Sequence, residues 1–162
     1  MKKKRRIWII HSGLRGEGHT DFMAKPWISL GWKRVNDLRL LKNNRAAFRA
    51  AVQKQYPSSA ASVRMKAGAL YRFLYKLHRK HTVIYPSPHG SVYVGTVEGE
   101  YEFRPKRNRA HHHVRKIKWI DERKKEDLSR RVRSALDHSA RSSLCQPRKF
   151  AQLLRSALLT KN

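Results

Sequence analysis

Trp32 is the side chain in this sequence best placed to hold a flat ligand. It ends an apolar run, residues 27–32, and an indole at the end of a strand can stack on an extruded nucleic-acid base and gain about 1–3 kcal/mol. Aromatic side chains near strand ends are also common as ordinary core. Both interpretations of Trp32 stay open at the level of the sequence.

A loop of small residues lies ahead of this run. Residues 11–20 contain three glycines, and Ser12 and Gly13 stand at the start of the loop. Small residues let backbone groups approach a ligand closely, so Ser12 could read the edge of a base. The glycine spacing is not that of a dinucleotide-binding fingerprint, and a plain flexible loop is the alternative.

Three further polar or aromatic positions are candidates for the same pocket. Asn36 follows Trp32 closely and could contact a base edge, although Asn36 and Asp37 are equally explained as a turn and helix cap. Tyr85 and Ser87 end a predicted strand and could form the opposite wall. Core packing is the simpler interpretation of Tyr85.

The sequence contains no recognisable catalytic or metal centre. Its acidic residues form no cluster with ligand spacing, and it has no serine-centred elbow, phosphate loop or paired cysteine motif. Residues 111–113 are three consecutive histidines, but neighbours on a strand face opposite sides, which favours a polar, phosphate-facing loop end over a metal site. We therefore expect a non-enzymatic protein without cofactor or metal.

The charge of the chain predicts the class of partner. Its 162 residues carry 38 Lys and Arg against 11 Asp and Glu, a formal net charge of +27. A compact state with this charge repels itself and is favoured beside a polyanion, of which nucleic acid is the commonest in cells. A solvated basic face without a defined footprint is the alternative. The residues that we expect to contact phosphate are Arg15, Arg104, Lys106, Arg107, Arg109, Arg115, Lys116, Lys118 and Arg133.

The remaining composition describes the setting. A single cysteine, Cys145, excludes an internal disulfide framework and favours a reducing compartment. No apolar run approaches the roughly 18 residues of a membrane span, so we expect a cytoplasmic protein that does not bind membranes. Residues 1–6 form a basic arm, which either grips phosphate or is merely solvated.

The elements that must position these residues are predicted by periodicity. Two apolar strands come first, the second beside the first, then two helices, a hairpin, two more strands and a helix capped by Asp127. A loop over residues 141–147 leads to a short amphipathic helix, which is a linker or a docking helix for a partner. The predicted segments are residues 7–10, 27–32, 45–55, 63–77, 82–85, 91–97, 101–103, 114–120, 127–136 and 150–159. This order favours an α+β fold, a small curved sheet or open barrel with flanking helices.

Several of these segments, in this order and spacing, resemble a known domain. The similarity lies in residues 7–10 with the glycine loop, 28–32, 70–73, 83–87, 92–97, 111–119 and 127–136, and covers roughly residues 7–144. The chain resembles the PUA-like, EVE-type domain at the N-terminus of Mrr-like, modification-dependent restriction endonucleases. It departs from that pattern at residues 78–81, where the family has a Gly-Asp turn, and in its higher charge.

The resemblance implies a function as well as a fold. Such a domain takes a modified base, a C5-modified cytosine in DNA, out of the duplex into an aromatic pocket and directs a restriction nuclease to it. The nuclease domain is absent here, so cutting would need another domain or subunit. On this basis the chain divides into an arm (1–6), a PUA-like domain (7–144) and a C-terminal linker or short helix (145–162). The alternative is a PUA-like domain that binds structured RNA without selecting a modified base.

Overall fold

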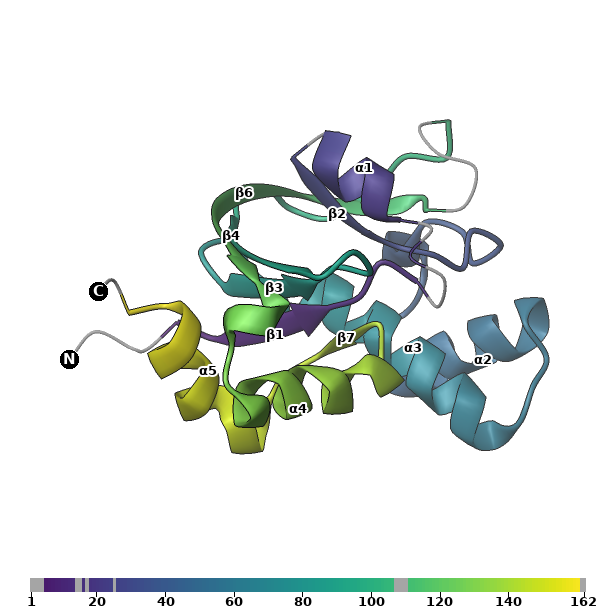
Figure 1. Cartoon of the computed structure of the whole chain (residues 1–162). Helices are drawn as coiled ribbons and strands as arrows, with labels where there is room; N and C mark the ends of the chain where they lie inside the picture. The colour runs from purple at the N-terminus through teal and green to yellow at the C-terminus, as the bar shows by residue number, and fades with distance from the viewer. Residues whose placement is uncertain (1–4, 14–15, 17, 25, 107–110, 161–162) are drawn as a thin grey trace.

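The protein is a mixed α/β structure whose sheet curls strongly on itself (Figure 1). The computed structural model describes residues 5–13, 16, 18–24, 26–106 and 111–160. The strands are β1 (Ile7–Ile10), β2 (Trp27–Leu30), β3 (Thr82–Pro86), β4 (Ser91–Val97), β5 (Glu102–Phe103), β6 (His113–Lys124) and β7 (Leu144–Cys145). The helices are α1 (His19–Ala24), α2 (Arg45–Gln55), α3 (Ala60–Tyr75), α4 (Arg130–His138) and α5 (Ala151–Leu158). The predicted α+β class, with an open curled sheet and flanking helices, is confirmed.

Strand β6 joins the two halves of the sheet. Over the described residues the strand order is β2-β6-β4-β3-β1-β7, and β5 pairs with β6 off this path. The first four residues of β6 pair with β2, whereas Ile117 to Lys124 pair with β4. The register shifts at Gly95, where an added Cβ would lie 2.8 Å from the Ile117 side chain. This close approach, which only glycine permits, lets β4 and β6 bend together.

The pairing of β1 differs from what the sequence suggests. The two apolar runs were expected to lie side by side, but β1 pairs in parallel with β3 and antiparallel with β7, while β2 pairs with β6. Apolar periodicity identifies a strand but contains no signal for its partner. The parallel pairing is possible because α2 and α3 lie in the long connection from β1 to β3.

Both faces of β1 are buried, which explains its continuous apolar sequence. Trp8 and Ile10 join a core that contains Phe48, Leu70 and Phe73 from α2 and α3. Ile7 and Ile9 join a second core under α4 and α5. Figure 1 shows this arrangement, with α4 and α5 side by side below β1 and β7.

The C-terminal part of the chain packs on the sheet. Leu154 and Leu158 of α5 are buried in the second core, and Cys145 of β7 pairs with Ile9. The apolar side of α5 is therefore used inside the chain, where the sequence alone suggested a linker or docking helix. The loop predicted over residues 141–147 is wrong at β7, because a strand of two residues is too short to show alternation.

The predicted cap of α4 is also wrong. Asp127 lies in a single 3₁₀ turn, Lys125–Asp127, and the N-cap is Ser129, whose Oγ accepts a hydrogen bond from the Val132 N–H at 3.2 Å. Serine and aspartate are comparable caps, and Ser129 is the one immediately ahead of the apolar spacing of α4. No helix in the part of the chain that the structure describes is long and apolar enough to cross a membrane.

Arg115 is a structural residue of β6. Its side chain is 1% exposed and donates hydrogen bonds to the carbonyls of Phe73 (2.9 Å), Leu74 (3.0 Å) and Gly99 (3.1 Å). Burial lowers its pKa to about 10, so it stays charged at neutral pH. The prediction that Arg115 contacts phosphate is therefore wrong. Its guanidinium closes the C-terminal end of α3, where helix carbonyls lack partners and favour a cation.

Replacing Arg115 with methionine is expected to destabilise the fold. The buried carbonyl of Phe73 and the partly buried carbonyls of Leu74 and Gly99 would lose their donors. One unsatisfied buried group costs about 1–3 kcal/mol, so a loss of at least this size is expected. Urea unfolding measures it, with Lys118→Met as the control because Lys118 is exposed on the same strand. Equal stability of the two variants would contradict this role.

Candidate functional site

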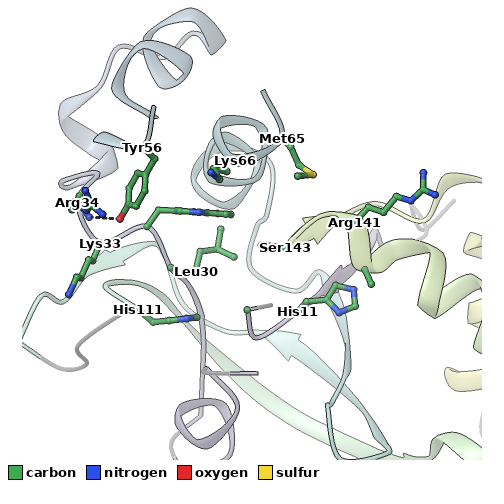
Figure 2. A pocket seen from close by; sticks show the side chains of 14 residues that line it. His11, Leu30, Lys33, Arg34, Tyr56, Met65, Lys66, His111, Arg141 and Ser143 are labelled. Atoms are coloured by element: carbon green, nitrogen blue, oxygen red, sulfur yellow. Dashed lines mark hydrogen bonds between the residues drawn. The ribbon is translucent and has the colours of Figure 1, made fainter. Parts of the chain in front are cut away.

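A cavity of about 690 Å³ opens beside the end of β2. Its walls come from the loop after β1, the loop after β2, the start of α3 and the turn after α4 (Figure 2). The lining residues are His11, Gly13, Leu30, Gly31, Trp32, Lys33, Arg34, Tyr56, Met65, Lys66, His111, Ala140, Arg141 and Ser143. Its size is that of a site for a small organic ligand.

Trp32 lines this cavity from a strained backbone position. Its φ is +62°, in the left-handed region that side chains other than glycine rarely adopt, at a cost of about 1–3 kcal/mol. Its carbonyl accepts a hydrogen bond from the Val35 N–H at 3.0 Å, and its half-buried ring packs against the first core. Trp32 thus both packs against the core and faces a cavity. Strain of this kind is common at ligand sites.

Cations surround the aromatic wall. Lys33, Arg34, Lys66 and Arg141 all line the cavity, and no carboxylate is present among the described lining residues. Arg34 lies on Tyr56, with its Cζ 4.7 Å from the ring centroid, and its backbone N–H donates to the Tyr56 hydroxyl at 3.1 Å. Tyr56 therefore links the loop after β2 to the turn between α2 and α3. The charge of this cavity favours an anionic or acceptor-rich ligand.

Imidazole rings form part of the wall away from α2. The Ser139 hydroxyl donates to the Leu136 carbonyl, so His11 Nε2 is the donor in its 3.0 Å contact with Ser139 Oγ. Burial, and then the charge of Lys125, lowers the pKa of His11. His111 is held by a 2.9 Å hydrogen bond between its Nδ1 and Ser29 Oγ. Both rings are fixed by the fold.

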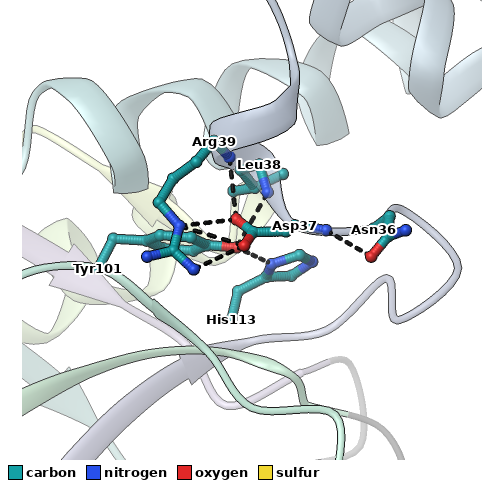
Figure 3. A network of polar contacts seen from close by, with 6 residues as sticks. All are labelled: Asn36, Asp37, Leu38, Arg39, Tyr101 and His113. Carbon is teal, nitrogen blue, oxygen red and sulfur yellow. Dashed lines mark hydrogen bonds and ion pairs between the residues drawn. The ribbon is translucent and has the colours of Figure 1, made fainter.

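A polar network supports the loop that carries Trp32 (Figure 3). The Tyr101 hydroxyl accepts from the Leu38 N–H at 3.1 Å and lies 2.8 Å from His113 Nδ1. Asp37 caps the 3₁₀ turn Leu38–Leu40 and pairs with Arg39 at 2.6 Å, and the Arg39 hydrogen bond lowers the pKa of Asp37. The cap interpretation of Asp37 is confirmed.

Four predicted pocket residues do not line this cavity. Asn36 is exposed, and its Oδ1 accepts from the Asp37 N–H at 2.8 Å. Tyr85 is fully buried, donates to Ser12 Oγ at 2.8 Å and has a pKa that burial raises to about 12. Ser87 is buried in the turn after β3, where its Oγ accepts from the N–H groups of His89 and Ser91. These three, with Ser12, support neighbouring structure, and Trp32 and Gly13 are the predicted residues that reach the cavity.

Sequence reasoning missed much of the lining. Folding alone brings to Trp32 a set of residues that lie up to 132 positions apart in the sequence: His11, Tyr56, Lys66, Arg141 and Ser143. Residues 56–59 (YPSS) were recognisable as a turn. Nothing in the sequence around Tyr56, however, indicates that its side chain lines a ligand site.

The expected phosphate contacts are spread over the surface. Lys106, Lys116, Lys118 and Arg133 are exposed, and Arg104 is exposed but paired with Glu102 at 2.7 Å. Arg104 and Lys116 also lie over the Trp27 ring, at 4.6 and 5.5 Å from its centroid. Arg15, Arg107 and Arg109 lie outside the described residues. Among the residues that the structure describes, no group of three or more His, Cys, Asp or Glu could hold a metal ion.

These elements define an α+β domain with a strongly curled open sheet and a cationic, aromatic cavity beside one edge strand. The chain belongs to the family described as Domain of unknown function (DUF8426), whose model matches residues 8–141. That range includes Trp32, Tyr56 and Arg141 and ends ahead of β7 and α5. No curated protein and no solved structure matches the chain.

Two histidines with lowered pKa values, the buried His113 and the half-buried His81, make stability depend on pH. Burial lowers the pKa of His113 from 6.5 to about 4, and that of His81, which accepts hydrogen bonds from Trp8 Nε1 and the His78 N–H, to about 4 as well. Between pH 6.5 and pH 4 these two histidines bind more protons in the unfolded chain than in the folded chain. The free energy of unfolding therefore decreases as the pH falls from 6.5 to 4. His113 alone accounts for roughly 3 kcal/mol of this loss.

Urea unfolding between pH 7 and pH 4 measures this effect. His113→Gln is expected to reduce the slope of unfolding free energy against pH by about 1.4 kcal/mol per pH unit within that window. The remaining slope comes in part from His81. Identical slopes for the variant and the unchanged protein would show that His113 does not titrate in this way.

Proposed function

We propose that this chain is a non-catalytic DNA-binding module of PUA-like architecture that takes an extruded, C5-modified cytosine into the cavity beside Trp32. One observation carries the proposal: a half-buried indole, held in a left-handed backbone conformation, lines a 690 Å³ cavity surrounded by cations. The curled open sheet with flanking helices supports the architecture.

Base extrusion needs compensation that this cavity can supply. Removing a base from a duplex costs a few kcal/mol, and stacking on an aromatic ring returns about 1–3 kcal/mol. Trp32 and Tyr56 provide aromatic surface, and Lys33, Arg34 and Lys66, which also line the cavity, would contact the phosphates on either side of the extruded nucleotide. Phosphate contacts position the duplex, and the cavity reads the base.

The proposed module binds DNA and catalyses no reaction, so it would act by directing an enzyme to the DNA. We propose that this enzyme is a restriction nuclease in a further domain or a partner subunit. Foreign or modified DNA would be the target.

Trp32→Ala is expected to remove selection of the modified base and keep most non-specific binding. The indole stacks only on an extruded base, whereas the surface cations remain, so a loss of about 5–150-fold is expected for modified duplex alone. Competition at one salt concentration between modified duplex, plain duplex and structured RNA measures it. Trp119→Ala is the matched control, because Trp119 is another half-buried indole packed on the same core but outside this cavity.

Two results would contradict the proposal. Equal affinity of the unchanged protein for plain and modified DNA would show that the protein does not select a modified base. Tighter binding of structured RNA than of either duplex would instead favour the RNA-binding alternative.

The salt dependence of binding tests the phosphate contacts. About eight contacts predict a slope near −7 for log K against log salt, and Lys33→Gln and Lys66→Gln should each make it less steep by about 0.9. Their preference for modified over plain duplex should persist. Trp32→Ala removes no charge and should leave the slope unchanged. If neither lysine substitution changes the slope, the DNA binds at another surface of the protein.

A further inference from the structure

Helix α2 leaves one long side open to solvent. Of its eleven residues only Phe48 and Val52 are buried, both in the core that α3 also joins. Figure 1 shows α2 at the edge of the molecule, beside α3. Two rows of exposed side chains run along the open side at intervals of four residues: Arg45, Arg49 and Gln53, and beside them Ala46, Ala50 and Lys54. This side therefore has polar groups along its full length and no large apolar side chain.

The α2–α3 hairpin lies in a long stretch of chain without a carboxylate side chain. Residues 38–97 contain 11 Lys and Arg and no Asp or Glu. Arg45 and Arg49 repel each other across one helical turn, and Arg45 stands at the N-terminal end of α2, where the helix dipole disfavours a cation. These costs to the free helix are offset beside a polyanion. Charge complementarity therefore favours a polyanion as the partner of this side of α2.

Both ends of α2 are fixed to the rest of the fold. Asn44 caps the N-terminal end, and the Arg45 Cζ lies 4.7 Å from the centroid of the Tyr71 ring of α3. Tyr56, which follows the helix directly, is held by Arg34 and lines the cavity. The exposed side of α2 is thus presented on a rigid element that begins beside the cavity.

The Arg45 row contains side chains that are suited to reading DNA bases. In the major groove, arginine donates two hydrogen bonds to guanine O6 and N7, and glutamine pairs with adenine N6 and N7. Arg49 and Gln53 stand about 6 Å apart along the helix axis, close to two base-pair steps of about 3.4 Å. A helix about 10–12 Å across also fits a groove about 12 Å wide.

We propose that α2 lies in the major groove of duplex DNA, where Arg49 and Gln53 contact base edges and Arg45 and Lys54 contact phosphates. This contact rests on the DNA binding of the proposed function, but it requires neither the cavity nor an extruded base. It gives the protein a preference for the DNA sequence that lies next to the cavity.

Two observations favour duplex DNA among the possible polyanions. The major groove of an RNA duplex is too narrow for side chains to read. A helix that lies on an anionic membrane buries large apolar side chains, and the exposed side of α2 has none. Duplex DNA uses both properties of this surface, its charge and its row of hydrogen-bonding side chains.

Selection from a pool of plain duplexes of random sequence tests the base contacts. We expect the unchanged full chain to enrich guanine at one position and adenine about two steps away. Arg49→Lys keeps the charge but lacks the planar fork of donors, so it should reduce the guanine preference about fivefold or more. Gln53→Ala should reduce the adenine preference alone by a similar factor.

Two control variants match these substitutions. Arg133→Lys and Gln152→Ala change the same residue types at exposed positions of α4 and α5. Both base preferences should persist in the controls. If Arg49→Lys and Gln53→Ala select the same sequences as the controls do, α2 does not read the DNA and the inference is overturned.

Methylation interference identifies the groove. A methyl group on guanine N7 lies in the major groove, whereas one on adenine N3 lies in the minor groove. We expect guanine N7 methylation at the enriched position to weaken binding about fivefold or more and adenine N3 methylation to have no effect there. Interference at adenine N3 alone would place the DNA contact in the minor groove and overturn the inference.

The same variants separate this groove contact from the modified-base reader. If Arg49→Lys changes the selected sequence but Trp32→Ala leaves the preference for modified duplex unchanged, the reader fails and the groove contact stands. If only Trp32→Ala has its expected effect, the reader stands and the groove contact fails. Binding of structured RNA without binding of any DNA duplex overturns both.

Discussion

The buried guanidinium of Arg115 is the contact on which the cavity depends. It ties β6 to the last carbonyls of α3 and to Gly99, so helix and sheet are held in one arrangement. Helix α3 carries Lys66 and Met65 to the cavity, while β6 carries His113 to the network beneath the Trp32 loop. A buried cation is expensive to desolvate, and here helix carbonyls compensate it. This contact adds to the core packing of α3 and to the Arg34–Tyr56 contact in holding the two walls of the cavity together.

The strain at Trp32 is maintained by the same support. A tryptophan with positive φ persists only where the surrounding structure holds it. The Val35 N–H bonds its carbonyl, and Tyr101 fixes the next turn through the Leu38 N–H. The strained residue thus lies between a rigid turn and the core. The strained backbone of Trp32 lowers the stability of the fold and fixes the orientation of its indole. Such fixed side chains are typical of preorganised binding sites.

The sequence predicted local structure better than long-range arrangement. The spacing of Val63, Leu70 and Leu77 and the alternation of residues 91–97 are local signals, and α3 and the β3–β4 hairpin are confirmed. Trp32 was identifiable because it ends an apolar run. The pairing of β1, the burial of Arg115 and the approach of Tyr56 and Arg141 to Trp32 depend on contacts between distant segments, and none of these has a local pattern. Arginine in a strand reads as a surface residue because few arginines are fully buried.

The distribution of the few acidic residues sharpens the electrostatic character of the cavity. Several of the chain's 11 carboxylates pair with nearby cations: Asp37 with Arg39, Asp121 with Arg123 and Asp137 with Lys125. None of these pairs lines the cavity, where four cations have no carboxylate beside them among the described lining residues. Exposed pairs of this kind add little stability, about 0–1 kcal/mol each. Their carboxylates do not line the cavity, so the positive charge of Lys33, Arg34, Lys66 and Arg141 is not neutralised by a described lining residue.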